Sequence, residues 1–165
     1  MAGKLSIKTG SFNSDCYEDC LALRYRVLRE PLGLRRTDGF DAEIERKAMH
    51  LAAYWDAQLI GCVVLQPQDS SYKLRQMAVE EVWQGQGIGR QLVLACIKHA
   101  GEIGVAEIYC HARLYAKGFY EKLGFIEEGN LFSEVSIPHV KMVLKPIAIP
   151  RVGTHNDGLL MRGVL

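Results

Sequence analysis

Three glycines at alternate positions, Gly85, Gly87 and Gly89, lie between an apolar stretch that ends near Val79 and a helical pattern that begins near Ile88. A glycine lets the backbone approach a ligand closely because no Cβ stands in the way. The free N–H groups at a helix start, together with the helix dipole, attract an anion. The segment therefore predicts a phosphate or pyrophosphate site between a strand and a helix. The alternative is that these glycines only shape a tight turn.

Two common phosphate-binding motifs do not match this loop. The phosphate-binding loop of the nucleotide triphosphatases requires Gly-Lys followed by Ser or Thr, and the sequence has no such triplet. The dinucleotide fingerprint requires glycines at its first, third and sixth positions, but the sixth position counted from Gly85 is Arg90. That fingerprint also belongs to the first strand–helix unit of its domain, whereas this loop lies in the middle of the chain. A nucleotide-binding regulator is therefore disfavoured.

The hydrophobic pattern predicts one α/β domain over residues 1–146 and a C-terminal tail over 147–165. The first half reads as a meander of strands after one helix, which Asn13 or Ser14 would cap. Residues 38–49 fit either a short helix or a loop. In the second half, strands alternate with helices, which implies parallel pairing of the flanking strands. The predicted strands lie near residues 5–7, 51–55, 59–65, 72–79, 105–110, 132–135 and 139–144, and the helices near 14–28, 88–104 and 112–123.

Charge and cysteine content exclude several classes of partner. Twenty Lys and Arg against 19 Asp and Glu give a net charge of +1, so the whole chain has no electrostatic footprint for nucleic acid or an anionic membrane. No apolar run reaches the roughly 18 residues of a membrane span, and the N-terminus has no secretory pattern. Five cysteines without a metal-ligand spacing indicate reduced thiols and no metal site. We expect a cytoplasmic protein.

At two places the sequence resembles the GNAT superfamily of N-acetyltransferases. Gln84-x-x-Gly87-x-Gly89 is similar to the signature loop of that family, and it follows a matching strand over residues 74–79. Downstream, residues 119–125 resemble the family's later helix, with its Tyr-x-x-x-Gly-Phe ending. The two motifs occur in the expected order. The resemblance extends over about residues 5–145 and is closest to a branch of small bacterial enzymes.

The resemblance implies a GNAT fold, in which a mixed, mostly antiparallel sheet is splayed at its centre and flanked by helices. It also implies transfer of an acetyl group from acetyl-coenzyme A to a primary amine, without a metal, and it suggests a homodimer. The acceptor stays open: a protein N-terminus, a polyamine, an amino sugar or an antibiotic. The alternative is a non-catalytic module that senses an acyl-coenzyme A. The residues implied in coenzyme binding are Met77, Ala78, Val79, Gln84, Gly85, Gln86, Gly87, Ile88, Gly89 and Arg90.

By the same resemblance, Tyr120 donates a proton to the departing thiolate, although its periodicity alone favours a core tyrosine. A neutral amine must lose a proton during the reaction, so a base is needed. His111, Glu134 and His139 are the candidate base or substrate-binding residues, and a water chain to the carboxylates at positions 80 and 81 is the alternative.

A row of arginines in the first helix and in the loop after it also has two interpretations. The pattern is typical of a solvated helix face, but in the GNAT family this helix and loop commonly form one wall of the acceptor site. The arginines are Arg24, Arg26, Arg29, Arg35 and Arg36.

Overall fold

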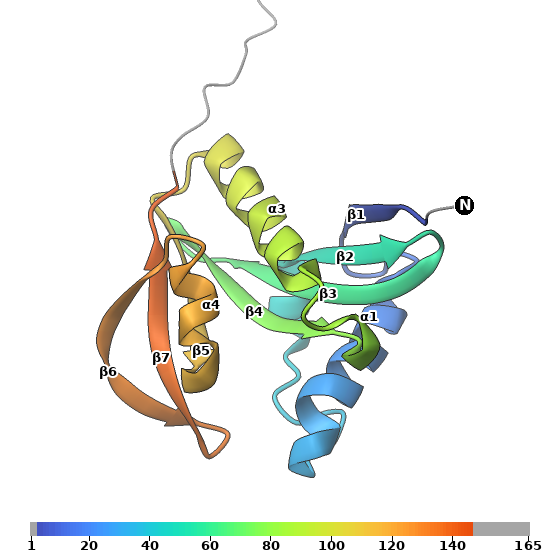
Figure 1. Ribbon diagram of the computed structural model, residues 1–165, viewed down its shortest axis with the longest axis horizontal. Helices are drawn as coiled ribbons and strands as arrows, with labels where there is room; N and C mark the ends of the chain where they lie inside the picture. Colours follow the sequence, from blue (N-terminus) through green and yellow to red (C-terminus); the bar gives the residue numbers. More distant parts are fainter. Residues whose placement is uncertain (1–2, 147–165) are drawn as a thin grey trace, which may run out of the picture.

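The computed structural model describes residues 3–146, so the predicted tail over 147–165 lies outside the described residues. A seven-stranded sheet with the order β1-β2-β3-β4-β5-β7-β6 forms its centre (Figure 1). Only β4 and β5 pair in parallel, and every other neighbouring pair is antiparallel. This confirms the mixed, mostly antiparallel sheet. The strands are β1 (Leu5–Gly10), β2 (Met49–Trp55), β3 (Gln58–Pro67), β4 (Ser71–Val79), β5 (Glu107–Arg113), β6 (Ile126–Glu134) and β7 (Ile137–Leu144).

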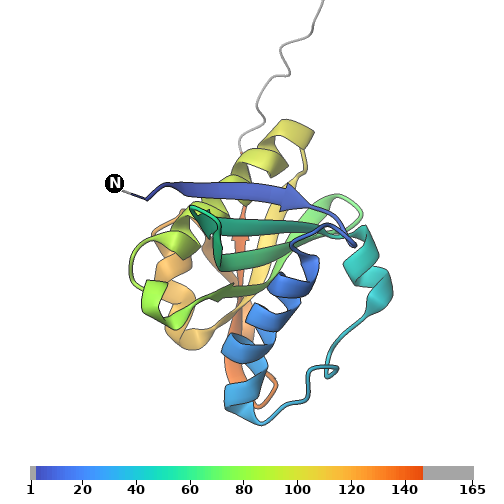
Figure 2. The ribbon, with the colours of Figure 1, turned by 90° about the vertical axis from the view of Figure 1, so that its right-hand side faces the viewer.

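Helices cover both faces of the sheet. On one face, α3 (Ile88–Ile103) and α4 (Lys117–Glu121) enclose the larger core, which includes Leu92, Val93 and Phe125. On the other face, α1 (Tyr17–Arg24) buries a smaller cluster, and α2 (Ala42–Lys47) lies beside it (Figure 2). The apolar spacing in α3 explains its position, because residues four apart lie on one helix face.

The sheet is splayed where β4 leaves β5. The two strands pair only from Ser71 to Leu74 on β4. Beyond that point β4 contains a β-bulge: Arg75 pairs with Val64 and Ala78 with Cys62, so β4 uses one residue more than β3. Gln76 lies in the bulge with a φ of +50°. A bulge bends its strand and strengthens the local twist, and β4 accordingly turns away from β5 (Figure 1).

The cap predicted for the first helix is wrong. Cys16, and not the side chain of Asn13 or Ser14, occupies the N-cap position of α1. Asn13 takes a φ of +68° in the preceding turn, and the Ser14 hydroxyl contacts the Cys16 thiol instead of a backbone N–H. The helix continues as a π-helical turn, η1 (Tyr25–Arg29), and a 3-10 turn, η2 (Glu30–Leu32), which ends at Gly33.

One further boundary differs from the prediction, and one open alternative is decided. The segment 112–123 is not one helix, because Ala112 belongs to β5 and pairs with Val140. A 3-10 turn, η4 (Leu114–Ala116), separates that strand from the short α4. Residues 38–49 contain a short helix, α2, and the Asp41 carboxylate caps it. Long-range ladder pairing thus overrides the helical pattern around Ala112.

Candidate active site

The glycine loop ends in an open helix N-terminus. Gly87 is the N-cap of α3 with a φ of +84°, and Gly85 has a φ of +74°. A Cβ at either position would meet no atom within 4 Å, so the space in front of the loop is free. The N–H groups of Ile88, Gly89 and Arg90 begin α3 and have no carbonyl one turn before them. Together with the helix dipole they form an anion site.

The two glutamines of the loop hold its shape. The Gln84 side chain donates from Nε2 to the Val79 carbonyl at 3.0 Å. The Gln86 side chain donates from Nε2 to the carbonyl of Val82 at 2.8 Å, in the 3-10 turn η3 (Glu81–Trp83). These side chains therefore fix the loop, which leaves the backbone N–H groups as its binding groups.

The predicted strand residues Met77, Ala78 and Val79 lie at the free edge of β4. On its other side β4 pairs with β3, through Ala78 with Cys62 and Val79 with Gly61. On the β5 side, no strand within residues 3–146 pairs with β4 beyond Leu74. The backbone N–H and C=O groups of an unpaired edge can bind an extended ligand as an additional strand would bind. This edge leads directly to the glycine loop.

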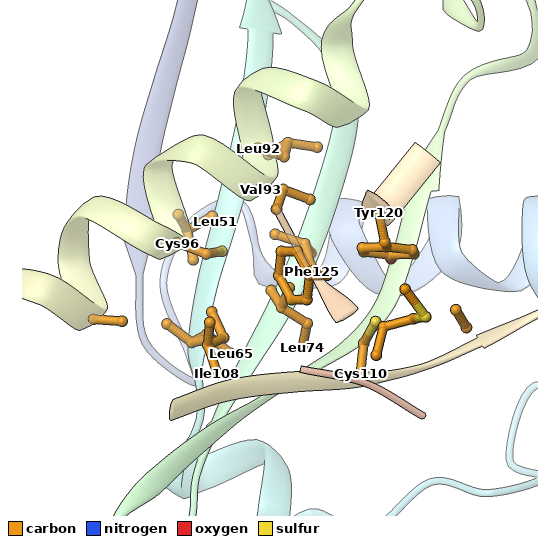
Figure 3. Close-up of a cluster of buried hydrophobic side chains, with 14 of the residues drawn as sticks. Leu51, Leu65, Leu74, Leu92, Val93, Cys96, Ile108, Cys110, Tyr120 and Phe125 are labelled. Atoms are coloured by element: carbon orange, nitrogen blue, oxygen red, sulfur yellow. The ribbon is translucent and has the colours of Figure 1, made fainter. Parts of the chain in front are cut away.

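Tyr120 is buried in the core between α4 and the sheet (Figure 3). It is 7% exposed, and its ring meets those of Phe119 and Phe125 edge-on, with centroids 5.0 and 5.4 Å apart. Burial raises the pKa of its phenol well above the usual value, and the neighbouring Cys110 adds to the effect. The phenol therefore keeps its proton at physiological pH. This agrees with a proton donor and also with a packed core tyrosine.

His111 is the centre of a polar cluster on the opposite face. Its Nδ1 lies 3.0 Å from Glu134 Oε2 and 3.2 Å from Lys73 Nζ. Burial and the Lys73 cation lower the pKa of His111, while Glu134 acts in the opposite direction. When the ring donates its Nδ1 proton to Glu134, the Nε2 lone pair is free to accept a proton. Sequence reasoning missed Lys73, which sits on another strand 38 positions away.

His139 lies beside this cluster but has a structural contact of its own. It is buried, and its Nδ1 is 2.7 Å from the Ile137 carbonyl, which fixes the turn between β6 and β7. Phe132 stacks on the His139 ring and meets the His111 ring edge-on. The fold therefore brings together the three residues that the sequence suggested, His111, Glu134 and His139. His139 differs from the other two, because its 2.7 Å contact with the Ile137 carbonyl ties it to the hairpin backbone.

The carboxylate of Glu80, one end of the suggested water chain, is already engaged. It forms an ion pair with Arg26 of η1. The remaining candidate in that chain, Glu81, is exposed in η3. The Arg26 guanidinium therefore occupies the Glu80 carboxylate.

Arg24 does not lie on a solvated helix face. It is 3% exposed, and its guanidinium donates to the Glu45 carboxylate at 2.9 and 3.1 Å and to Gln76 Oε1 at 2.6 Å. The Tyr17 hydroxyl donates to the same carboxylate at 3.0 Å. Burial alone would raise the pKa of Glu45, but the bonds from Arg24 and Tyr17 lower it. The network ties α1 and α2 to the bulge of β4.

A small pocket opens between this network and the following loop. It adjoins Gln76 of the bulge, and side chains of α1, η1, α2 and the loop before α2 complete its wall. The lining residues are Leu21, Arg24, Tyr25, Arg29, Arg36, Phe40, Glu45 and Gln76. The pocket lies on the side of β4 opposite α3, and Gln76 in its wall directly precedes Met77 of the free strand edge.

Residues 3–146 contain neither a candidate membrane span nor a candidate metal cluster. No helix there is long and apolar enough to cross a membrane. No three His, Cys, Asp or Glu residues in this range gather closely enough to hold a metal ion. All five cysteines are free thiols.

Comparisons with known proteins agree with this architecture. YitI of Bacillus subtilis, described as an uncharacterized N-acetyltransferase, is 29% identical over 145 residues, which cover 84% of this chain and 87% of YitI. A crystal structure assigned to an N-acetyltransferase of Lactobacillus plantarum matches with a TM-score of 0.78 and 25% identity, over 87% of this chain and 99% of that one.

A further solved structure shares the fold at lower identity. A GNAT family acetyltransferase from Elizabethkingia anophelis, with acetyl-CoA bound, matches with a TM-score of 0.63 and 19% identity, over 86% of this chain and 97% of that one. The model of the acetyltransferase (GNAT) domain family matches residues 32–146. The fold, the loop at the start of α3 and this match together show that the chain belongs to the GNAT family of acetyl-coenzyme A-dependent N-acetyltransferases.

Proposed function

We propose that the chain acetylates a primary amine in the groove between β4 and β5, with the residues described above in defined roles. The pyrophosphate of acetyl-coenzyme A binds the N–H groups at the start of α3, and the pantetheine arm pairs with the edge of β4 from Met77 to Val79. The observation that carries the proposal is the continuity of this free strand edge with the open helix N-terminus.

The reaction is a direct attack of the neutral amine on the thioester carbonyl. A C–N bond forms, the C–S bond breaks, and a backbone N–H near Val79 stabilises the negative charge on the carbonyl oxygen. The amine gives one proton to a base. The sulfur leaves as a thiolate and takes a proton from Tyr120, whose phenol stays protonated because it is buried.

His111 is the proposed base. Its lowered pKa keeps the imidazole neutral at physiological pH, and a neutral imidazole can accept a proton. Glu134 orients the ring and stabilises the imidazolium that forms, as its 3.0 Å contact with Nδ1 allows. Glu134 and His139 act as positioning residues in this scheme.

The test measures thiol release from acetyl-coenzyme A against a panel of amines, with mass spectrometry to detect a product that has gained one acetyl group. We expect release that depends on the amine and falls in a His111→Ala variant. A non-catalytic module would bind acetyl-coenzyme A in calorimetric titration, yet release no thiol with any amine. That outcome would overturn the proposal in favour of a sensor.

The proposal places the enzyme in the cytoplasm. Five free thiols agree with a reducing compartment. The homodimer that the sequence resemblance suggests remains a prediction, and sedimentation of the purified chain measures it.

A further inference from the structure

Three arginines around the point where β4 leaves β5 have no acidic partner. Arg75 on β4 donates to the amide oxygen of Gln66 at 3.0 Å. Arg113 on β5 donates to the Leu28 carbonyl at 3.4 Å, which places it beside the end of η1. Within residues 3–146, neither of these arginines nor Arg29 of η1 forms an ion pair with a carboxylate. These three guanidinium groups therefore place positive charge where β4 leaves β5, and no ion pair within the described residues neutralises it.

Arg29 differs in this respect from the other arginines of its own segment. Residues 24–36 contain five arginines, and four of them pair with a carboxylate: Arg24 with Glu45, Arg26 with Glu80, Arg35 with Asp38 and Arg36 with Glu18. Arg29 is half-buried and has no such partner in the described chain. Asp38 and Glu45, which pair with Arg35 and Arg24, act on Arg29 only at longer range, so its guanidinium is left without a close ion pair.

The surroundings of Arg29 favour a bound anion. Burial lowers the pKa of its guanidinium, and repulsion from Arg24 and Arg75 adds to the effect, while the carboxylates of Asp38 and Glu45 oppose it from beyond ion-pair distance. An arginine remains charged in spite of such a shift. A partly buried charge without a counter-ion is unfavourable, so an anion from the substrate would be held more tightly here than at an exposed arginine.

The pocket at Arg29 has the size and the place of a substrate subsite. The pocket is partly open to solvent and its volume is about 20 Å³, so it admits only the end of a small polar molecule. The planar guanidinium fork matches a carboxylate, and the small volume favours that group over the bulkier phosphate. Gln76 in the pocket wall precedes Val79 by three positions, about 10 Å along a strand, so a small molecule can span the distance to the thioester.

We infer that the acetyl acceptor is a small amine that also bears a carboxylate, and that Arg29 binds this carboxylate in the pocket beside Gln76 while the amine reaches the thioester. Arg75 and Arg113 add positive charge along the path by which the acceptor reaches the pocket. The inference rests on the proposed function, because it names the substrate class of the same site.

The experiment compares amino acids with their own carboxamides as acceptors. The panel contains α-amino acids, β-alanine and longer ω-amino acids, each with an amide that removes only the negative charge, and aminoalkylphosphonates of matching length. We expect kcat/KM for the best acid to exceed that of its amide by about 10- to 100-fold, the range for a charge-assisted hydrogen-bonded pair. Arg29→Gln should abolish this ratio by lowering kcat/KM for the acids more than for the amides, and Arg29→Lys should restore part of it.

The matched control is Arg46→Gln, which removes the same group from an exposed site on α2 and should leave the ratio unchanged. Equal turnover of acids and amides, an unchanged ratio in Arg29→Gln, or a preference for phosphonates would overturn the inference while the enzyme remains an N-acetyltransferase. If Arg29→Gln does not fold, the acid-to-amide ratio of the unaltered enzyme decides. Absence of thiol release with every amine would instead overturn the proposed function.

Discussion

In the proposed function, the coenzyme half and the acceptor half of the site bind by different means. On the coenzyme side, the binding groups are backbone atoms: the edge of β4 and the N–H groups at the start of α3. On the acceptor side, they are side chains of α1, η1, β5 and β6, held by buried polar contacts such as the Arg24–Glu45 ion pair. Backbone recognition depends on conformation, which a few glycines specify, whereas side-chain recognition depends on residues that are distant in sequence.

This difference explains why the sequence identifies the coenzyme more readily than the acceptor. Substitutions can change the side chains of the acceptor half while the glycine loop stays the same. Each prediction below tests one half against the other.

The largest effect is expected for the buried ion pair of the acceptor half. Glu45→Gln leaves the Arg24 guanidinium buried without a counter-charge, which should lower the free energy of unfolding by about 3–5 kcal/mol. The control, Glu43→Gln on the same helix, removes an exposed ion pair with Lys47 and should cost less than about 1 kcal/mol. Urea denaturation measures both. Equal losses of unfolding free energy in the two variants would show that the buried Arg24–Glu45 network does not stabilise the acceptor half more than an exposed ion pair does.

Gly87→Val should disrupt the coenzyme half. Valine is strained at a φ of +84°, and its branched side chain enters the space left for the pyrophosphate. We expect coenzyme A affinity to fall by about 100-fold or more, the equivalent of one or two charge-assisted hydrogen bonds. Calorimetric titration measures it. Gly104→Val imposes a similar strain at the far end of α3, where φ is +80°, and should spare binding; equal binding by both variants would remove the loop from the site.

Tyr120→Phe should lower kcat by about 10- to 100-fold, because it deletes the proton donor and keeps the packed ring. Acetyl-coenzyme A binding and Tm should hardly change. Because burial holds the pKa of this phenol well above its usual range, no loss of rate from its ionisation is expected at moderately alkaline pH. Tyr72→Phe is the control, since it removes a hydroxyl from β4 outside the groove. A kcat within about twofold of the parent would make Tyr120 a core residue only.

The pH profile should respond in opposite directions to the two neighbours of His111. The enzyme needs the neutral ring, so kcat/KM falls as pH drops through the pKa of His111, which lies below its usual value. Glu134→Gln removes a charge that favours the imidazolium and should shift this limb to lower pH. Lys73→Met removes a charge that opposes it and should shift the limb to higher pH. Shifts of about one pH unit or less are expected, and an unmoved limb in both variants would exclude His111 as the base.

The smallest effect is expected for Arg90→Gln. Its side chain is exposed at the start of α3, and exposed charge contacts contribute about 0.2–1 kcal/mol. Coenzyme A affinity should therefore fall no more than about fivefold. A larger loss, measured by the same titration, would mean that a side chain shares the binding that the backbone is proposed to provide.

Local signals predicted much of the fold. The β2–β3 hairpin, α3 and the glycine loop were predictable because their turn residues and periodicity act over short distances. The helix expected over 112–123 was not, since Ala112 is held in β5 by a ladder contact with Val140. The acceptor half could not be predicted for the same reason. The charged residues of α1 have the pattern of a solvated helix face, and only the contacts of Arg24 with Glu45 and Gln76, distant in sequence, show that it is buried.

The extra residue at Gln76 also determines to which face of the sheet each later side chain of β4 points. In a regular strand, residues three positions apart lie on opposite faces, but across the bulge Leu74 and Met77 both pack at the core under α3, while Gln76 contacts Arg24 on the other side. Deleting one residue here would turn every later side chain of β4 to the opposite face of the sheet. It would therefore misplace the residues beside the proposed coenzyme site and those beside the acceptor pocket at the same time. The groove can therefore change its substrate by replacing residues in this strand, but not by changing the length of the strand.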